Sequence, residues 1–146
     1  MQKIILASDH GGFELKNKVA QILTGAGHTI TDLGVYSPDS VDYPDIAQNA
    51  AATFLKGGYD FGILVCGTGI GISIAANKIH GIRCALIHDC FTAEMARAHN
   101  NANFIALGGR VVYHEPLEKI LASFVQSNHQ GGRHQTRIDK IHRLER

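Results

Sequence analysis

The chain has 146 residues, enough for one compact domain with its own core, so we expect a single domain over residues 1–146. Its 45% hydrophobic and 18% charged residues are typical of a globular protein, and a net charge of +1 argues against nucleic-acid or membrane-surface binding. The three cysteines lack the number and spacing of a disulfide framework or a zinc site, and no apolar stretch reaches 18 residues. We therefore expect a cytoplasmic protein with no membrane segment.

Short apolar runs alternate with helical patterns along the chain. The expected strands cover residues 3–8, 28–34, 61–67, 82–89 and 103–109. A helical face follows the first strand, residues 37–45 are expected to form a turn-rich loop, and further helices are expected over 46–58, 72–81, 91–100 and 115–128. Five strands separated by helices predict an α/β fold with a parallel sheet, helices on both faces and a basic tail at the end of the chain.

Polar and reactive side chains follow four of these strands. In open parallel sheets, ligands bind beyond the carboxyl ends of the strands. The residues at those positions are Asp9 and His10, Cys66 to Gly71, His88 and Asp89, and Gly109 and Arg110. Their concentration predicts a site at this edge, without fixing its chemistry.

The loop Gly67-Thr68-Gly69-Ile70-Gly71 has the composition of an anion-binding turn. Its glycines permit positive φ and close backbone approach, and successive N–H groups before a helix favour a phosphate or a developing oxyanion. It is one residue short of the dinucleotide pattern G-x-G-x-x-G and does not follow the first strand, although Asp32 could imitate a ribose-binding carboxylate. A plain strand-to-helix turn remains an alternative.

Cys66 stands at the end of an apolar strand, against this loop. A helix N-terminus and clustered amides favour a thiolate, which can act as a nucleophile or a base. The alternative is an inert buried cysteine, the interpretation that suits Cys84. Residues 88–90 (His-Asp-Cys) could suggest a metal, but consecutive residues rarely point at one ion, so we expect none.

The C-terminal segment carries Arg133 and Arg137, four residues apart. On a helix they would project from one face and could clamp a phosphate, or they could belong to a solvated basic tail. Ile138, Ile141 and Leu144 add an apolar stripe that we expect to pack against a partner subunit.

Five separated motifs resemble one known family. The segments SDHGGFELK, DYPDIA, GILVCGTGIGISIAANKIHGIR, ARAHNNANFIALGGRVV and GGRHQTRI are similar, in this order and from end to end, to the ribose-5-phosphate isomerase B family, which includes the galactose-6-phosphate isomerase subunits. The resemblance implies a Rossmann-like three-layer sandwich with a C-terminal helical tail, and a homodimer with shared active sites, a tetramer staying open. It also implies interconversion of ribose 5-phosphate and ribulose 5-phosphate in the non-oxidative pentose phosphate pathway, without metal or cofactor.

The resemblance also implies roles for individual residues. Cys66 would move a proton between C2 and C1 through an enediolate, and the N–H groups of Gly67, Gly69, Ile70 and Gly71 would hold the oxyanion, assisted by the Thr68 hydroxyl. His99 would open the furanose ring and Asp9 would handle the ring oxygens. The remaining contacts would come from His10, Arg110, Arg133 and Arg137 to the phosphate, Asn100 to a hydroxyl, and Tyr43 as a wall.

One position separates this chain from part of the family. Some relatives use a glutamate where this chain has Ile72, which is apolar and leaves the proton to Cys66.

Two alternatives to the proposed activity stay open. The substrate could instead be a six-carbon sugar phosphate, such as allose 6-phosphate or galactose 6-phosphate. A sugar-phosphate sensor without turnover would need the loop and the arginines but neither Cys66 nor His99.

Overall fold

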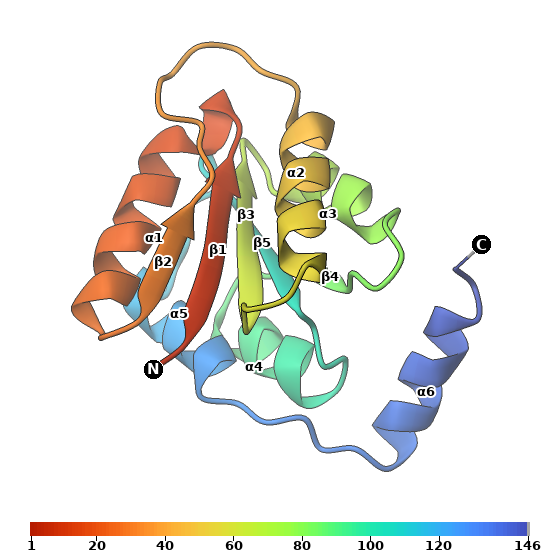
Figure 1. The fold of residues 1–146 in the computed structure, drawn as a ribbon. Coiled ribbons are helices and arrows are strands. Elements are labelled where there is room, and N and C mark those ends of the chain that lie inside the picture. Colours follow the sequence, from red (N-terminus) through yellow and green to blue (C-terminus); the bar gives the residue numbers. More distant parts are fainter. Residues whose placement is uncertain (146) are drawn as a thin grey trace.

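The computed structural model describes residues 1–145, built around one parallel sheet of five strands. The strand order is β2-β1-β3-β5-β4 (Figure 1). The strands are β1 (Lys3–Ser8), β2 (Thr29–Asp32), β3 (Phe61–Cys66), β4 (Cys84–Leu86) and β5 (Phe104–Gly108). Every residue of the central strand β3 is buried, because helices cover both faces of the sheet. The expected five-stranded parallel sheet is confirmed.

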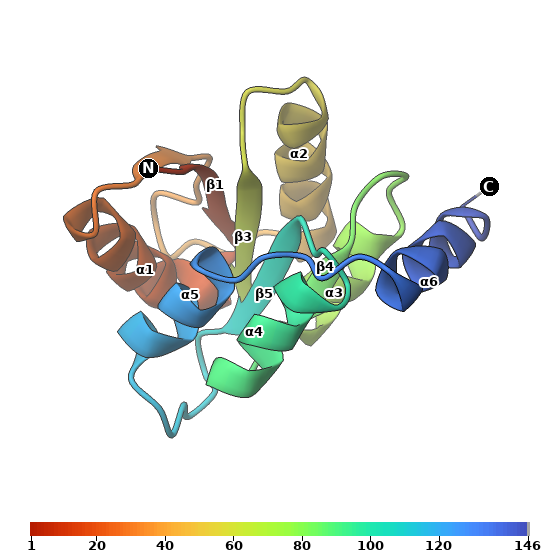
Figure 2. The ribbon, with the colours of Figure 1, turned by 90° about the horizontal axis from the view of Figure 1, so that it is seen from below.

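The helices form the outer two layers (Figure 2). One face of the sheet packs against α1 (Phe13–Gly25), α4 (Cys90–Ala98) and α5 (Leu117–Val125), and the other against α2 (Tyr43–Leu55) and α3 (Ile70–Asn77). A short 3₁₀ helix, η1 (His10–Gly12), follows β1, and α6 (Arg133–His142) forms the C-terminal tail. The three-layer sandwich and the helical tail are confirmed.

Several element boundaries differ from those predicted. The strand predicted over 82–89 is only Cys84–Leu86, because the Asp89 carboxylate accepts the Thr92 N–H at 2.7 Å and caps α4 instead. Helix α2 begins at Tyr43, inside the predicted loop, with Pro44 in its first turn. Helix α3 begins at Ile70, inside the glycine loop, so the N–H groups of that loop belong to a helix start.

The loop after β2 is fixed by an ion pair between a buried lysine and a partly exposed aspartate. The Lys16 side chain is 1% exposed and its Nζ lies 2.5 Å from Asp32 Oδ2. Asp32 Oδ1 also accepts the Gly34 N–H at 2.8 Å, and the Tyr36 hydroxyl donates to the Asp32 carbonyl. The start of this loop is thereby tied to α1, beside the carboxyl ends of β1 and β2.

Within residues 1–145, no helix has both the length and the hydropathy needed to cross a bilayer.

The three apolar residues of the C-terminal segment differ in burial. Ile138 is buried by the chain itself, whereas Ile141 and Leu144 are exposed. The predicted apolar stripe of α6 is therefore divided, and its first residue packs within its own chain.

Candidate functional site

The carboxyl ends of β1, β3 and β5 meet around Cys66, which is 4% exposed. Cys66 pairs with Gly108 in the parallel register of β3 and β5, and the next residue, Gly109, donates its N–H to the Cys66 carbonyl at 2.8 Å. The Arg110 N–H donates to the Gly67 carbonyl at 2.9 Å. The end of β5 therefore follows the glycine loop closely and fixes the backbone beside the thiol.

The glycine loop aims one backbone N–H at the sulfur. Gly69 has a φ of +79° and donates its N–H to Cys66 Sγ over 3.1 Å. A Cβ at Gly69 would lie 2.6 Å from Leu86 Cδ1 and 3.0 Å from the Leu107 carbonyl carbon, so the site requires glycine. The Thr68 hydroxyl accepts the Ile70 N–H at 3.2 Å. The loop leads into the N-terminus of α3, a position suited to an anion.

Asp9 and His10 lie beside this loop, each with a defined hydrogen-bond partner. Asp9 is 6% exposed, and its Oδ1 accepts the Gly12 N–H at 3.1 Å. A Cβ at Gly11 would lie 3.0 Å from the Gly67 nitrogen, which shows how closely η1 approaches the loop. His10 Nδ1 accepts the Val41 N–H at 3.2 Å, so the neutral ring carries its proton on Nε2 and can donate it to a ligand.

Tyr43 and Arg110 complete this group from two other elements. A Cβ at Gly71 would lie 2.6 Å from Tyr43 Cζ, and one at Gly67 would lie 3.1 Å from Arg110 Nη1. His10 and Arg110 both line a cavity of about 240 Å³. We call this group the Cys66 site; it comprises Asp9, His10, Tyr43, Cys66, Gly67, Thr68, Gly69, Ile70, Gly71 and Arg110.

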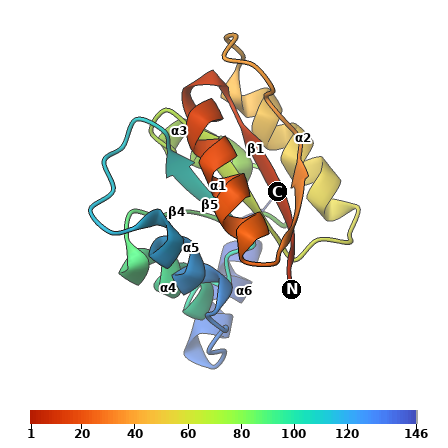
Figure 3. The ribbon, with the colours of Figure 1, turned by 90° about the vertical axis from the view of Figure 1, so that its left-hand side faces the viewer.

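His99, Asn100, Arg133 and Arg137 lie elsewhere in the same chain. His99 ends α4, and the turn after it leads into Phe104 at the start of β5, whereas Cys66 pairs with Gly108 at the end of that strand. Four residue steps along a strand separate the two ends by about 13 Å. Helix α6, which carries both arginines, lies at the opposite end of the sheet from η1 (Figures 1 and 3).

These residues form a second group around the end of α4. The rings of His99 and His134 stack with centroids 4.0 Å apart and planes 10° apart. The Ala98 carbonyl accepts the Gln130 N–H at 2.9 Å, which docks the segment before α6. We call this group the His99 cluster; it comprises His99, Asn100, His129, Arg133, His134 and Arg137.

The charge of the His99 cluster is positive and largely uncompensated. Burial lowers the pKa of His134, and His99, Arg133, Arg137 and His129 lower it further by repulsion. Both arginines are exposed, and the ion pair recorded within residues 1–145 is that of Lys16 with Asp32. Two guanidiniums on one helix face are therefore available to an anionic ligand.

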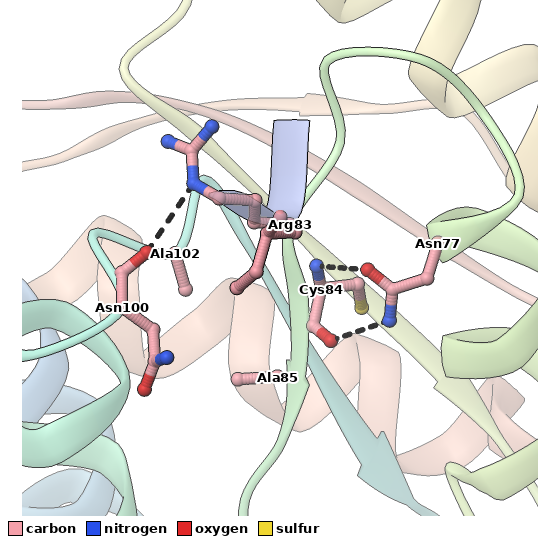
Figure 4. A pocket seen from close by; sticks show the side chains of 7 residues that line it. Asn77, Arg83, Cys84, Ala85, Asn100 and Ala102 are labelled. Carbon is pink, nitrogen blue, oxygen red and sulfur yellow. Dashed lines mark hydrogen bonds between the residues drawn. The ribbon is translucent and has the colours of Figure 1, made fainter. Parts of the chain in front are cut away.

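The turn after His99 is clamped by Arg83 (Figure 4). Its Nε donates to the carbonyls of Asn100 at 3.2 Å and Asn101 at 3.1 Å, and its Nη2 donates to the Asn101 carbonyl at 2.7 Å. Asn101 has a φ of +42°, the one positive value of a non-glycine residue among residues 1–145. Arg83 also lines a cavity of about 240 Å³, together with Asn77, Cys84, Ala85, Asn100, Ala102 and Ile141.

Cys84 contrasts with Cys66. Burial raises the pKa of the Cys84 thiol to about 12, so this residue stays protonated, as its interpretation as an inert core residue requires. Among residues 1–145, no three His, Cys, Asp or Glu side chains are grouped to hold a metal ion. Reasoning from sequence did not single out Arg83 or His134; the only available signal for His134 was its place between the two arginines in GGRHQTR.

Comparisons with known proteins identify relatives over nearly the whole chain. The family model described as Ribose/Galactose Isomerase matches residues 4–141. Ribose-5-phosphate isomerase B of Escherichia coli is 41% identical over 145 residues, covering 99% of this chain and 97% of the relative. The structure of Clostridium thermocellum ribose-5-phosphate isomerase B has a TM-score of 0.94 at 45% identity, covering 98% of this chain and 97% of that one. The Mycoplasma genitalium enzyme, solved with bound ribulose-5-phosphate, has a TM-score of 0.90 at 43% identity, with coverage of 98% and 95%.

Proposed function

The chain belongs to the ribose/galactose isomerase family, and we propose that it interconverts D-ribose 5-phosphate and D-ribulose 5-phosphate, with residues 1–146 acting as one domain. The observation that carries the proposal is the Cys66 sulfur, which lies 3.1 Å from the Gly69 nitrogen in the loop that starts α3. The names of the relatives support the substrate, and so does the ribulose-5-phosphate bound to the Mycoplasma genitalium enzyme.

The proton transfer follows from the geometry of the Cys66 site. The Cys66 thiolate removes the proton from C2 of the open-chain aldose, the electron pair of that C–H bond forms a C1–C2 double bond, and the carbonyl π pair moves to O1 to give an enediolate. The same thiol returns the proton to C1 while the hydroxyl proton of O2 passes to O1, which leaves a carbonyl at C2 and yields the ketose. The N–H groups of residues 67–71 and the Thr68 hydroxyl stabilise the negative oxygen, and a donor of this kind contributes about 3 kcal/mol.

Ring opening precedes that transfer, because ribose 5-phosphate is mainly a furanose. In the proposed mechanism His99 transfers the proton that opens the ring, and Asp9 orients the ring oxygens from its buried position. Asn100 binds a hydroxyl and Tyr43 walls the pocket beside Gly71. These steps use proton transfer and hydrogen bonding alone, so we propose that the reaction needs no metal or cofactor.

The separation of the two groups argues for a homodimer. Four groups are assigned to one phosphate, but His10 and Arg110 lie in the Cys66 site while Arg133 and Arg137 lie in the His99 cluster. With about 13 Å of strand between the ends of β5, one sugar phosphate cannot reach both groups in one chain. We propose that the His99 cluster of one copy completes the Cys66 site of another, in the cytoplasm and within the non-oxidative pentose phosphate pathway.

Isomerisation of ribose 5-phosphate in the presence of EDTA tests this function. Wild type and Cys90→Ala, which removes a cysteine on α4, should both produce ribulose 5-phosphate, whereas Cys66→Ala should lose at least about a hundredfold in turnover. Turnover that survives in Cys66→Ala would assign the base to another residue. A wild type inactive on ribose 5-phosphate would contradict the proposed substrate, and the same assay on allose 6-phosphate and galactose 6-phosphate would identify a six-carbon isomerase.

A further inference from the structure

The ring of His99 is held by stacking rather than by hydrogen bonds. His134 lies against it with ring centroids 4.0 Å apart and planes 10° apart. Within residues 1–145 the His99 ring makes no hydrogen bond, so both of its nitrogens are open to a ligand. A ring that must exchange protons with a sugar needs a fixed orientation and free nitrogens, and a stacked neighbour supplies both.

His134 is itself firmly placed on α6. Its side chain is 7% exposed, and the Gln130 N–H bonds the Ala98 carbonyl at 2.9 Å just before the helix. His129 Nδ1 lies 3.1 Å from the same carbonyl. The backbone after His99 is held separately, since Arg83 binds the carbonyls of Asn100 and Asn101. The backbone of the turn and the ring of His99 therefore have different supports.

The protonation state of His134 suits this contact. Burial, followed by the charges of His99, Arg133, Arg137 and His129, lowers the pKa of His134, so its ring is neutral at pH 7. A neutral ring can stack on His99 in either of its protonation states. Two charged imidazoles at this distance would repel each other.

We propose that His134 is a positioning residue that fixes the orientation of the His99 imidazole by stacking, so that His99 can transfer the proton of ring opening. The role of His99 in this inference rests on the proposed function, whereas the contact between the two rings does not. A flat side chain at position 134 should preserve the orientation, and a branched aliphatic one should lose it.

The contact is tested first by NMR on His134→Leu, His134→Phe and the control Lys140→Leu, which changes an exposed residue of the same helix. A ring stacked on another moves its proton resonances upfield, so the His99 ring protons should lose this shift in His134→Leu, keep an upfield shift in His134→Phe and stay near their wild-type positions in Lys140→Leu. His99 resonances that are unchanged in His134→Leu would overturn the inference, whatever reaction the protein catalyses.

Kinetics with ribose 5-phosphate test the consequence. His134→Leu should lower kcat by about tenfold to a hundredfold with little change in KM, and His134→Phe should restore most of it. A higher KM with unchanged kcat in His134→Leu would mean that His134 only docks α6 and its arginines, and would overturn the positioning role. His99→Ala separates the two claims: if it leaves turnover intact, the proposed role of His99 fails, and the NMR result alone decides the contact.

Discussion

The Cys66 site and the His99 cluster are built by different means. The Cys66 site is formed mainly by the backbone: its strand ends are in register, Gly69 has a φ of +79°, and the Gly69 N–H is directed at the Cys66 sulfur. In the His99 cluster, side chains on the ends of two helices meet through stacking and long cationic groups, and both arginines are exposed. Backbone donors are fixed by the fold, whereas the cluster depends on how α6 docks.

This difference predicts different responses to mutation. Changes in the Cys66 site should act through sterics and should affect turnover, because in the proposed mechanism its donors face the reacting atoms. Changes in the His99 cluster should act through charge and contact: loss of an arginine should affect binding, loss of His99 or His134 should affect ring opening, and the docking of the cluster should depend on pH. The following experiments test that division, beginning with the largest expected effect.

Gly69→Ala should damage the Cys66 site most. Alanine is strained at φ +79°, and its Cβ would lie 3.0 Å from the Leu107 carbonyl carbon, which is backbone and cannot rotate away. The loop and its N–H groups must therefore shift, and turnover should fall about a hundredfold or more. Gly57→Ala is the matched control, because Gly57 has a φ of +91° with open space around it. It should cost about 1 kcal/mol of stability and leave turnover intact. Equal turnover in the two variants would contradict the steric account.

Asp32→Ala tests the anchor of the loop beside the Cys66 site. It leaves the Lys16 ammonium, 1% exposed, without its partner, so the free energy of unfolding should fall by about 3 kcal/mol. Asp39→Ala, in the exposed part of the same loop, should change it by less than about 0.5 kcal/mol. Urea titration measures both, and similar midpoints would show that this ion pair does not anchor the loop.

Arg137→Ala should affect binding rather than chemistry. Loss of one charge-assisted contact to phosphate should raise the KM for ribose 5-phosphate by about tenfold or more with little change in kcat. Lys140→Ala removes a positive charge one turn further along α6 and is the control. An unchanged KM in Arg137→Ala would remove this arginine from the phosphate site.

The docking of α6 should weaken in mild acid. Because burial and nearby cations hold the pKa of His134 below its ordinary value of 6.5, protonation favours the undocked state. Docking is therefore fully stable above about pH 6.5 and loses stability as the pH falls below it. Hydrogen exchange at the Gln130 amide, corrected for intrinsic rates, should accelerate from about pH 7 to about pH 5.

The Thr92 amide is the internal reference for that experiment. It donates to the Asp89 carboxylate, whose pKa is lowered by its hydrogen bonds to Thr92. For such an acid, the stabilisation is present above its ordinary pKa and is lost only as the pH falls through the lowered value. Thr92 should therefore stay protected over the range in which Gln130 opens. Constant protection at Gln130 would contradict the charge account of the cluster.

The sequence predicts one of these regions much better than the other. Continuous apolar runs such as that of β3 predict buried parallel strands, and topology then brings Asp9, Cys66 and Arg110 to one edge. The sequence places the glycine loop directly before a helix, and the structure starts that helix, α3, two residues earlier than predicted, at Ile70. Boundaries set by caps, such as Asp89 for α4, depend on side-chain contacts that periodicity does not encode.

The His99 cluster was less predictable for a physical reason. The motif residues His99 and Arg133 are visible in the sequence, but their distance from Cys66 depends on where α4 ends and on where the C-terminal segment with α6 packs. The stacking of His134 on His99 joins residues 35 positions apart through a single contact between rings. Neither periodicity nor local propensity carries such a contact, so only the structure could reveal it.

Subunit complementation tests the central claim, that the two regions of different copies form one active site. Cys66→Ala and His99→Ala should each be inactive as purified homodimers. When the two chains are co-expressed, half of the dimers are mixed and each mixed dimer has one intact site, so roughly a quarter of wild-type turnover should return. Co-expression of Cys66→Ala with the double variant Cys66→Ala/His99→Ala should restore none. A mixture as inactive as its parents would contradict the shared site and place the whole reaction within one chain.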